Sequence, residues 1–367
     1  MASLASSLAS SGLSVTYVAG KDMSQRRSEQ GWTAPAIGDA QLYIADDIER
    51  IKVLADRAPS NSVHLVQGLR GKEAMSVVRE QLVQRRLRQW AIMETVDDRG
   101  WRGLPKKFAY SRVIQRWRPH LDGVLAIGHL TPKWISERGL GSEKVFPFAY
   151  FLSDNGRVCS HPTIVASSFQ FLYVGQFIGR KRIDLLFKAL SSLKGRDFVV
   201  RMVGSGPLEG ELRAAGKKLL GDRVEWLGRR PVDTIPAIMA SADCCVLPSE
   251  HDGWGAVVCE ALMAGTPVIC SDACGAAGVV GTSGFGGVFP TGNADALADL
   301  LANAMAQGSP SAAERQRLSE WSKCLGAKTG ARYFNCILEH VYRGGDRPAP
   351  PWESEPALVR WKVNSYD

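Results

Sequence analysis

An acidic, glycine-rich segment in the second half of the sequence has residue types suited to binding a polyhydroxylated anion. Asp252-Gly253-Trp254-Gly255 follows an apolar run and opens a helical stretch that carries Glu260. Glycines at a helix start let backbone amides approach a phosphate, and the helix dipole favours an anion there. Both carboxylates could accept hydrogen bonds from hydroxyls of one ligand. The alternative interpretation is an acidic cap beside a solvated glutamate.

A basic turn earlier in the chain could supply the opposite charge. Gly175 ends an apolar run, and Gly179 precedes the consecutive cations Arg180, Lys181 and Arg182. A helical pattern begins at the next residue, so the cations would lie at a helix N-terminus, which is typical of a phosphate site. An exposed basic turn is the alternative.

A third loop contains Gly204-Ser205-Gly206-Pro207. It departs from the dinucleotide fingerprint G-x-G-x-x-G, because the next glycine, Gly210, comes one position too late. This disfavours a dehydrogenase. Glycines here still permit close approach of the backbone to a ligand or to a neighbouring helix.

Short apolar runs alternate with helical stretches in both halves of the chain, which is typical of parallel α/β sheets. We expect strands in the first half at Leu13–Val18, Gln41–Ile44, Ser62–Val66, Trp90–Glu94 and Gly123–Ile127. We expect strands in the second half at Gln170–Val174, Asp197–Val203, Val224–Leu227, Ala242–Leu247 and Pro267–Cys270. Because ligands of such sheets bind at the carboxyl ends of strands, the three loops are candidates for one site.

The chain length of 367 residues favours two domains. We predict a first doubly wound domain over residues 1–165 and a second over 166–345. Residues 150–163, with Asn155-Gly156 in them, read as the linker, and a Pro-rich extended arm is expected over 346–367. No internal repeat is evident.

Taken in order, the motifs resemble those of the family-4 retaining glycosyltransferases of GT-B fold. The donor domain of that family carries P-S-x-x-E-G-[FW]-G followed by E-A-x-A-x-G-x-P-V. The segments that match this pattern are Pro248-Ser249, Asp252–Gly255, Glu260-Ala261 and Ala264–Val268. Earlier segments also occur in the order of the family: Val174-Gly175 with Arg180-Lys181, Val203–Pro207 and Trp226–Gly228. Gly287-Val288 with Gly292-Asn293 resembles a late turn of the same domain. The resemblance covers residues 165–305 closely and 124–151 loosely. It implies two Rossmann-like domains facing a central cleft.

The resemblance also implies roles for individual residues in the second domain. Glu260 would hold the ribose hydroxyls and Asp252 the hydroxyls of the donor sugar. Lys181 and Arg180 would neutralise the leaving diphosphate, assisted by the amides of residues 253–255. Family members usually have glutamate where this chain has Asp252. The shorter carboxylate side chain would reach the sugar differently or would select another sugar.

The remaining donor-binding residues lie in the glycine loops. Gly175 and Gly204 would line the donor site, and the base would lie near Gly228 and Arg229. Gln176 stands where the family often has arginine, so that more of the phosphate binding would fall to the two cations named above. No cofactor and no metal are implied.

The first domain is expected to supply the acceptor side. Glu94 ends an expected strand and would reach the acceptor or the donor sugar, as a fourth catalytic candidate; the alternative is a carboxylate that braces a loop. Arg70, in Gly68-Leu69-Arg70-Gly71, could bind a phosphate, and His129 is the histidine that most merits a test. The start, Leu8–Val15, resembles the end of the first helix and the beginning of the second strand of such domains, so that the first strand and Gly-rich loop would be missing.

The resemblance implies transfer of a hexose from a nucleotide diphosphate sugar to a saccharide or lipid-linked saccharide, with retention of anomeric configuration, in surface polysaccharide or envelope glycan synthesis. One alternative is a noncatalytic nucleotide-sugar-binding protein. Another is a GT-B phosphorylase or epimerase. The sequence leaves the base, sugar, acceptor, linkage and oligomeric state open.

Positive charge is concentrated in one segment. The net charge is +8, and residues 79–118 hold eleven basic and four acidic residues with five interleaved aromatic residues. Cations with aromatic rings suit an anionic membrane surface or a phosphate-bearing acceptor. A solvated helix face is the alternative, and nucleic acid ranks last because no recognised motif accompanies the segment.

Targeting and cysteine patterns favour a cytoplasmic protein, peripheral at the inner face of a membrane. No apolar run is long enough to span a bilayer. Residues 1–14 lack the basic start of a secretory signal, since Lys21 is the first cation. The eight cysteines include no C-x2-C pair, so we expect free thiols in a reducing compartment rather than zinc ligands or disulfides.

Overall fold

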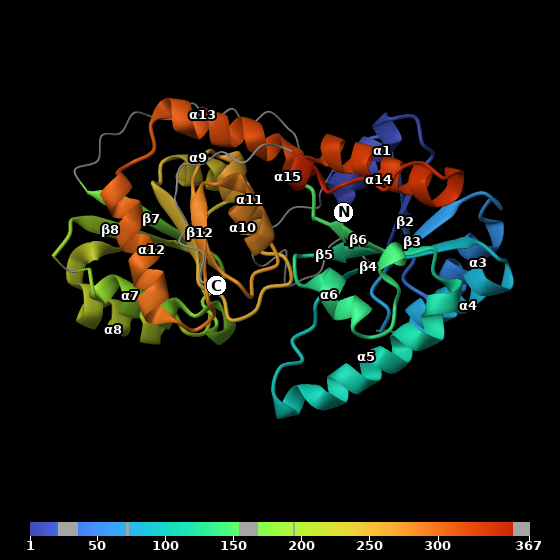
Figure 1. The fold of residues 1–367 in the computed structure, drawn as a ribbon, viewed down its shortest axis with the longest axis horizontal. Coiled ribbons are helices and arrows are strands. Elements are labelled where there is room, and N and C mark those ends of the chain that lie inside the picture. The colour runs from blue at the N-terminus through green and yellow to red at the C-terminus, as the bar shows by residue number, and fades with distance from the viewer. Residues whose placement is uncertain (21–35, 71–72, 154–167, 194, 355–367) are drawn as a thin grey trace. The chain divides into compact units, whose positions relative to one another are not determined.

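The computed structural model describes residues 1–20, 36–70, 73–153, 168–193 and 195–354 (Figure 1). Contacts divide the chain into two units. Among the described residues, unit 1 comprises those within 1–20, 36–151 and 330–350, and unit 2 comprises those within 152–329 and 351–354. The sequence assigned residues 330–345 to the second domain, whereas the chain returns to unit 1 at Gly330. The expected linker lies mostly outside the described residues.

Unit 2 contains a six-stranded parallel sheet in the order β12-β11-β10-β7-β8-β9. The strands are β7 (Phe169–Val174), β8 (Phe198–Val203), β9 (Val224–Gly228), β10 (Cys244–Leu247), β11 (Val268–Ser271) and β12 (Gly286–Phe289). The chain builds β7, β8 and β9 outward in one direction and then places β10, β11 and β12 on the other side of β7. This is the doubly wound dinucleotide-fold order, with its switch point between β7 and β10.

Helices connect these parallel strands, and two more follow the last strand, β12. They are α7 (Ile183–Ser191), α8 (Glu209–Leu220), α9 (Ile235–Ala240), α10 (Ala256–Met263), α11 (Ala277–Ser283), α12 (Ala294–Gln307) and α13 (Ala312–Trp321). Every residue of β10 and β11 is buried, because a central parallel strand is covered on both faces. A ligand can therefore bind at the ends of these strands rather than on a face of the sheet.

Unit 1 contains a four-stranded parallel sheet in the order β3-β4-β5-β6 and a two-stranded parallel sheet, β1-β2. The strands are β1 (Thr16–Ala19), β2 (Gln41–Ile44), β3 (Val63–Gln67), β4 (Arg88–Glu94), β5 (Gly123–Ile127) and β6 (Val145–Phe148). The helices are α1 (Ala2–Ser10), α3 (Ile48–Arg57), α4 (Glu73–Gln84), α5 (Leu104–Trp117), α6 (Thr131–Ser136) and, from Gly330 onward, α14 (Ala327–Arg343). The order of α1 and β1 agrees with the helix and strand expected at the start.

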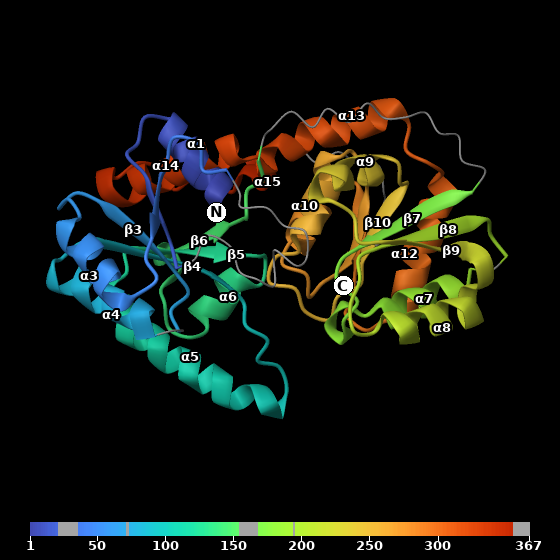
Figure 2. The same ribbon diagram turned by 180° about the vertical axis from the view of Figure 1, so that it is seen from behind.

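Helices cover both faces of the four-stranded sheet of unit 1. Figures 1 and 2 show α14 on one face and α3, α4 and α5 on the other. On the first face, the buried ring of Trp90 lies 6.2 Å from Phe334 of α14. On the second, Ala91 and Met93 share a core with Ile114 of α5. Alternation along β4 therefore separates two layers, as the pleat requires.

Two strands were not predicted from the sequence. β6 contains Pro147, which cannot donate a ladder hydrogen bond, and β6 lies at the edge of its sheet, where proline is tolerated. Gly287-Val288, interpreted as a late turn, instead belongs to β12. A Cβ at Gly286 would lie 1.8 Å from the Val268 carbonyl oxygen, so this strand needs glycine to approach β11.

The expected extended arm is also partly wrong. Pro351–Ser354 forms a short helix, α15, which begins at proline, a residue whose fixed φ suits a first helical position. Trp352 of α15 is buried in unit 2. Residues 355–367 lie outside the described part of the chain. Among the described residues, none of the helices combines the length and apolarity needed to cross a bilayer.

Candidate functional site

The candidate site in unit 2 lies at the carboxyl ends of β7 and β10, next to the switch point. β10 pairs with β7 through Cys244 and Cys245, and the chain leaves the two strands at Gly175 and Pro248. Loops from neighbouring strands that depart in opposite directions leave a crevice between them, where ligands of such sheets bind. The basic turn and the acidic segment singled out from the sequence are these two loops.

Lys181 and Asp252 contact each other directly. The Lys181 ammonium donates to the Asp252 carboxylate, and these side chains are only 10% and 15% exposed. Arg180 is more accessible, with its guanidinium 3.9 Å from the same carboxylate and donating to the His251 carbonyl at 3.0 Å. Three of the four residues predicted as catalytic therefore lie together, and the charges are partly withdrawn from water.

The basic turn is fixed by its backbone. The Lys181 amide donates to the Ile178 carbonyl at 3.0 Å, and the Glu250 amide donates to the Arg180 carbonyl at 2.8 Å. Arg182 adopts a left-handed conformation with φ of 49°, which is uncommon for a residue other than glycine. Its side chain pairs with Asp184 in the first turn of α7 at 3.0 Å. The turn thus holds Lys181 inward while Arg182 faces the surface.

The acidic segment is held by the loop that follows β11. The Asp252 amide donates to the Ala273 carbonyl at 3.1 Å, and the Gly275 amide donates to the Asp252 carbonyl at 2.8 Å. Gly255 caps α10 in a left-handed conformation with φ of 82°. A side chain at Gly255 would also strike Cys274, at 2.6 Å. Glycine is therefore required here to place the amides of residues 253–255 at the helix start.

The loops after β8 and β9 adjoin the basic turn. The Gly175 amide donates to the Val203 carbonyl at 3.0 Å, and the Gly204 amide donates to the Gly228 carbonyl at 2.9 Å. The Arg229 guanidinium donates to the Ser205 hydroxyl. The predicted donor-binding glycines therefore lie along one edge of the sheet, in the order of the strands that carry them.

Glu260 and Trp254 differ in what they can present to a ligand. Glu260, on α10, is half-buried and keeps part of its side chain accessible. The Trp254 side chain is buried, with its ring centroid 6.4 Å from that of Trp352. Trp254 therefore contributes to packing through its ring, and a role in ligand binding is left to its backbone.

Groups beneath the site are held in their neutral forms. Burial, together with the negative charge of Asp252, raises the pKa of Tyr173, whose hydroxyl donates to the Gln176 carbonyl at 3.0 Å. Burial raises the pKa of the Cys245 thiol to about 12. Within the described ranges, no three His, Cys, Asp or Glu side chains gather in a way that could hold a metal ion.

Two contacts of the site were missed by the sequence reasoning. The His251 carbonyl and the Ser205 hydroxyl accept hydrogen bonds from predicted site arginines. A backbone carbonyl leaves no signature in residue type. Ser205, by contrast, lies between the two glycines of the third loop, and this position next to the crevice was a usable signal.

Comparisons with known proteins agree with this geometry. Residues 162–323 match the protein family described as glycosyl transferases group 1. This segment contains every candidate residue of unit 2 from Gly175 to Glu260. Among solved structures, Anabaena HepE in complex with UDP aligns over 89% of this chain and 100% of that chain, with a TM-score of 0.68 and 16% identity. The chain has the GT-B glycosyltransferase fold.

Proteins similar to this chain in sequence include glycosyltransferases whose names give different substrates. The chain is 32% identical to 2-deoxystreptamine glucosyltransferase of Streptomyces kanamyceticus over 41% of this chain and 39% of that protein. It is 29% identical to phosphatidyl-myo-inositol mannosyltransferase of Mycobacterium leprae over 52% of each. The chain thus matches about half or less of the length of these relatives.

In unit 1 of this GT-B chain, the three predicted acceptor-side residues follow three adjacent strands. Arg70 follows β3, Glu94 ends β4 and His129 follows β5. All three therefore lie at the carboxyl edge of one sheet. Glu94 is half-buried and His129 is exposed, whereas the Arg70 guanidinium lies 5.7 Å from the centroid of the Tyr110 ring.

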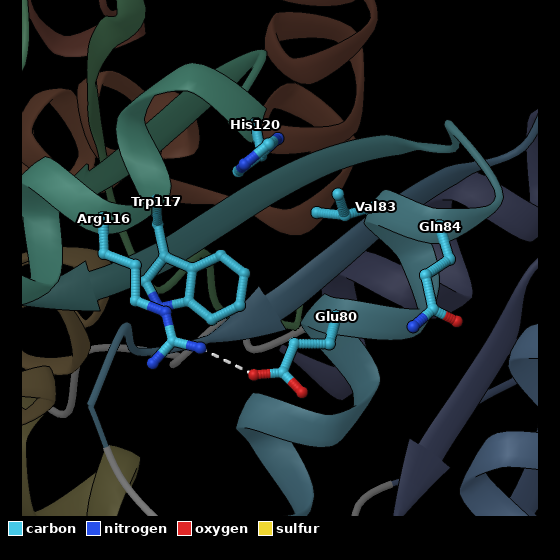
Figure 3. Close-up of a pocket in the computed structure, with 6 residues that line it drawn as sticks. All are labelled: Glu80, Val83, Gln84, Arg116, Trp117 and His120. Atoms are coloured by element: carbon cyan, nitrogen blue, oxygen red, sulfur yellow. Dashed lines mark hydrogen bonds and ion pairs between the residues drawn. The ribbon is translucent and has the colours of Figure 1, made fainter.

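A pocket of about 320 Å³ opens elsewhere on unit 1 (Figure 3). Its lining residues come from the ends of α4 and α5 and from the turn after α5: Glu80, Val83, Gln84, Arg116, Trp117 and His120. Arg116 pairs with Glu80 across it at 2.7 Å. Because both helices end where the following strands begin, the pocket lies at the amino edge of the sheet, opposite the edge that carries Glu94.

The basic segment over residues 79–118 is not one surface. Arg79 is buried and donates to the Gly68 carbonyl at 2.6 Å, and burial lowers its pKa to about 10. Arg88 lies 4.1 Å from the centroid of the Tyr342 ring. Arg99 pairs with Asp97 at 2.9 Å. Several of the cations counted from the sequence therefore make contacts within unit 1. The positive charge accessible to a partner is smaller than the count of basic residues in this segment indicates.

Proposed function

We propose that the chain transfers a hexose from a nucleotide diphosphate sugar to a saccharide or lipid-linked saccharide acceptor, with retention of anomeric configuration. The observation that carries the proposal is the Lys181 and Asp252 pair at the switch point of the unit 2 sheet. The paired ammonium and carboxylate supply one group for a diphosphate and one for sugar hydroxyls in the same crevice.

The proposed chemistry follows from these groups. The bond between the anomeric carbon and the diphosphate oxygen breaks, and the acceptor hydroxyl oxygen forms the new bond on the same face of the sugar. The acceptor proton passes to the departing phosphate oxygen. Lys181, Arg180 and the amides at the start of α10 stabilise the negative charge that develops on the leaving group, and such preorganised charges lower a barrier of this kind.

The comparisons support a uridine nucleotide as the first donor to test. HepE, which shares the fold, was solved with UDP and with UDP-glucose. The two sequence relatives named above are a glucosyltransferase and a mannosyltransferase. A half-buried Glu260 on α10 offers the carboxylate that would accept hydrogen bonds from ribose hydroxyls.

Thermal unfolding in the presence of UDP, GDP, ADP and their glucose or mannose conjugates tests donor binding. A nucleotide at a hundred times its Kd should raise the Tm of unit 2 by about 5–10 °C. Glu260→Gln should abolish the shift, whereas Glu211→Gln, an exposed glutamate of α8, should retain it. Absence of a shift with every nucleotide, in a folded sample, would contradict the proposed donor site.

Turnover distinguishes an enzyme from a noncatalytic nucleotide-sugar-binding protein. Release of free nucleotide from the conjugate that binds best should depend on added saccharide or lipid-linked saccharide, and Lys181→Met should reduce it about 100-fold or more. The anomeric proton coupling in the NMR spectrum of the product should report the configuration of the donor. Donor binding without acceptor-dependent release would favour the noncatalytic alternative, and an inverted product would contradict retention.

A further inference from the structure

Helix α5 of unit 1 has apolar side chains on two opposite faces. Its inward face contributes Ile114 and Trp117, which are buried, and the half-buried Tyr110 and Val113 pack against the same core. These positions are three or four residues apart, as expected for one side of a helix. The inward face alone accounts for attachment of α5 to the sheet.

Three large apolar side chains at and just before the start of α5 are exposed. Trp101, in the 3-10 turn Trp101–Gly103 before α5, is 76% exposed, and Leu104 and Phe108 of α5 are 61% and 60% exposed. Leu104 and Phe108 are four residues apart and lie on the side opposite Val113 and Trp117. These three residues, which we call the apolar ridge, are the most exposed large hydrophobic residues within the described part of the chain.

Cations flank the apolar ridge. Lys107 and Arg112 are exposed, and the Arg112 guanidinium lies 4.5 Å from the centroid of the Phe108 ring. Of the acids that precede the ridge in sequence, Asp97 pairs with Arg99 at 2.9 Å, and Asp98 pairs with the buried Arg138. The acids are thus neutralised locally, and the side chains around the ridge are positive.

The segment that leads into the ridge is anchored. The Asp98 carboxylate accepts hydrogen bonds from Arg138 and, at 3.1 Å, from the indole of Trp134. The Lys106 ammonium donates to the Asp97 carbonyl at 3.0 Å. These contacts hold the start of α5 against α6, so that the ridge is presented by ordered backbone. Figures 1 and 2 show α5 on the face of the four-stranded sheet opposite α14.

We propose that the apolar ridge, with Lys107 and Arg112, binds the surface of a bilayer that contains anionic lipids. The indole and phenyl rings and Leu104 would lie at the boundary between head groups and acyl chains, and the two cations at the depth of the phosphates. A convex helix with a narrow apolar ridge and flanking cations suits a planar anionic surface.

The position of the ridge deepens the proposed function. Because α5 begins just after β4, the ridge lies at the same edge of the unit 1 sheet as Glu94. An acceptor held in the membrane by a lipid would then be bound next to the acceptor-side residues. This last step rests on the proposed transfer, whereas binding of the membrane surface does not.

Co-sedimentation of the full chain with vesicles tests the proposal without donor or acceptor. The chain should bind vesicles of equimolar phosphatidylglycerol and phosphatidylcholine and should bind phosphatidylcholine vesicles weakly. Leu104→Ser with Phe108→Ser should lower the partition coefficient at least about tenfold. The matched control, Leu42→Ser with Val53→Ser, removes two other exposed apolar side chains of unit 1, 46% and 43% exposed, and should bind as the unaltered chain does.

Charge reversal supplies the second arm. Lys107→Glu with Arg112→Glu should lower binding to the anionic vesicles about tenfold, and added salt should weaken binding of the unaltered chain. Lys217→Glu with Lys218→Glu, on α8 of unit 2, makes the same change in net charge and should leave binding intact. Circular dichroism and Tm should match for all variants, since the altered residues are exposed.

Several results would overturn the proposal. The unaltered chain could fail to sediment with anionic vesicles, or it could bind neutral vesicles as strongly as anionic ones. The control variants could also lose as much vesicle binding as the variants of the apolar ridge. A dimer in light scattering that Leu104→Ser with Phe108→Ser converts to monomer, without vesicle binding, would assign the ridge to contact between copies instead. Because nucleotide binding is measured without vesicles, failure here is separable from failure of the proposed donor site.

Discussion

The Lys181 ammonium donates a hydrogen bond to the Asp252 carboxylate from 71 positions earlier in the chain. Both side chains are mostly covered, so each charge depends on the other for compensation. A ligand that presents a phosphate to Lys181 and hydroxyls to Asp252 would replace this pairing with contacts of the same kind. A change in either residue is therefore expected to affect both donor binding and local stability.

Removing one member of this pair should affect stability as well as turnover. Lys181→Met should lower the Tm, because it leaves Asp252 partly buried without its main partner, and should reduce nucleotide release about 100-fold or more. Lys217→Met removes a lysine that pairs with Asp222 on the surface, with side chains 72% and 94% exposed, and should change neither quantity appreciably. Equal effects of the two substitutions, by calorimetry and assay, would contradict this.

Gly204→Ala should disrupt the third loop. A Cβ at Gly204 would lie 1.9 Å from the Gly175 carbonyl oxygen, and its φ of 136° is unfavourable for alanine. We expect a loss of at least about 2 kcal/mol in the free energy of unfolding, measured with urea. Gly210→Ala, in α8, meets no atom within 4 Å and should be neutral or stabilising. A neutral Gly204→Ala would mean that the loops approach less closely.

Tyr342→Phe should destabilise unit 1. The indole of fully buried Trp90 donates to the Tyr342 hydroxyl at 2.8 Å, and that hydroxyl donates to Asp122 at 2.7 Å. Phenylalanine would leave the indole N–H buried and unsatisfied, at a cost of about 1–3 kcal/mol by chemical denaturation. Tyr43→Phe, on strand β2, is the comparison and should cost less. If both variants unfold alike, the hydrogen bond contributes little.

Thiol reactivity should divide the cysteines by burial. Cys336 is exposed, whereas Cys244, Cys259 and Cys270 are buried. Burial raises the pKa of the Cys259 thiol, so that little thiolate is present at neutral pH. In a Cys159→Ser variant, which removes the cysteine outside the described residues, one thiol should react rapidly with an aromatic disulfide reagent. The others should react only after unfolding, and several rapid thiols in the native state would contradict the burial described.

His64 should make the stability of unit 1 depend on pH. Burial lowers the pKa of His64 in the folded chain below its usual value of 6.5. The unfolded state then binds more protons, so stability is retained above pH 6.5 and is lost as the pH falls toward the folded pKa. Urea titrations at about pH 7.5 and 5.5 should show a smaller difference for His64→Asn than for the unaltered chain. An equal difference in His64→Asn and in the unaltered chain would contradict this expectation.

Much of the fold was predictable because local signals suffice for it. Apolar runs such as Phe171–Val174, followed by glycine turns and helical patterns, predict parallel strands and the loops that carry the site. The strand with Pro147 and the glycine-rich β12 were not predicted, since their residue types are unfavourable in strands. Their places are decided by what they pack against, which the sequence does not display.

The sequence by itself determined the motif order, the two parallel-sheet domains and the residues offered for a donor site, because these depend on short-range spacing. Only the tertiary structure decided which of those residues meet. It paired Lys181 with Asp252 and packed the Trp254 ring near that of Trp352. It also buried Arg79 of α4, which donates to the backbone carbonyl of Gly68. Such outcomes depend on contacts between residues far apart in the chain, where desolvation and close packing, rather than residue type, determine the role of a side chain.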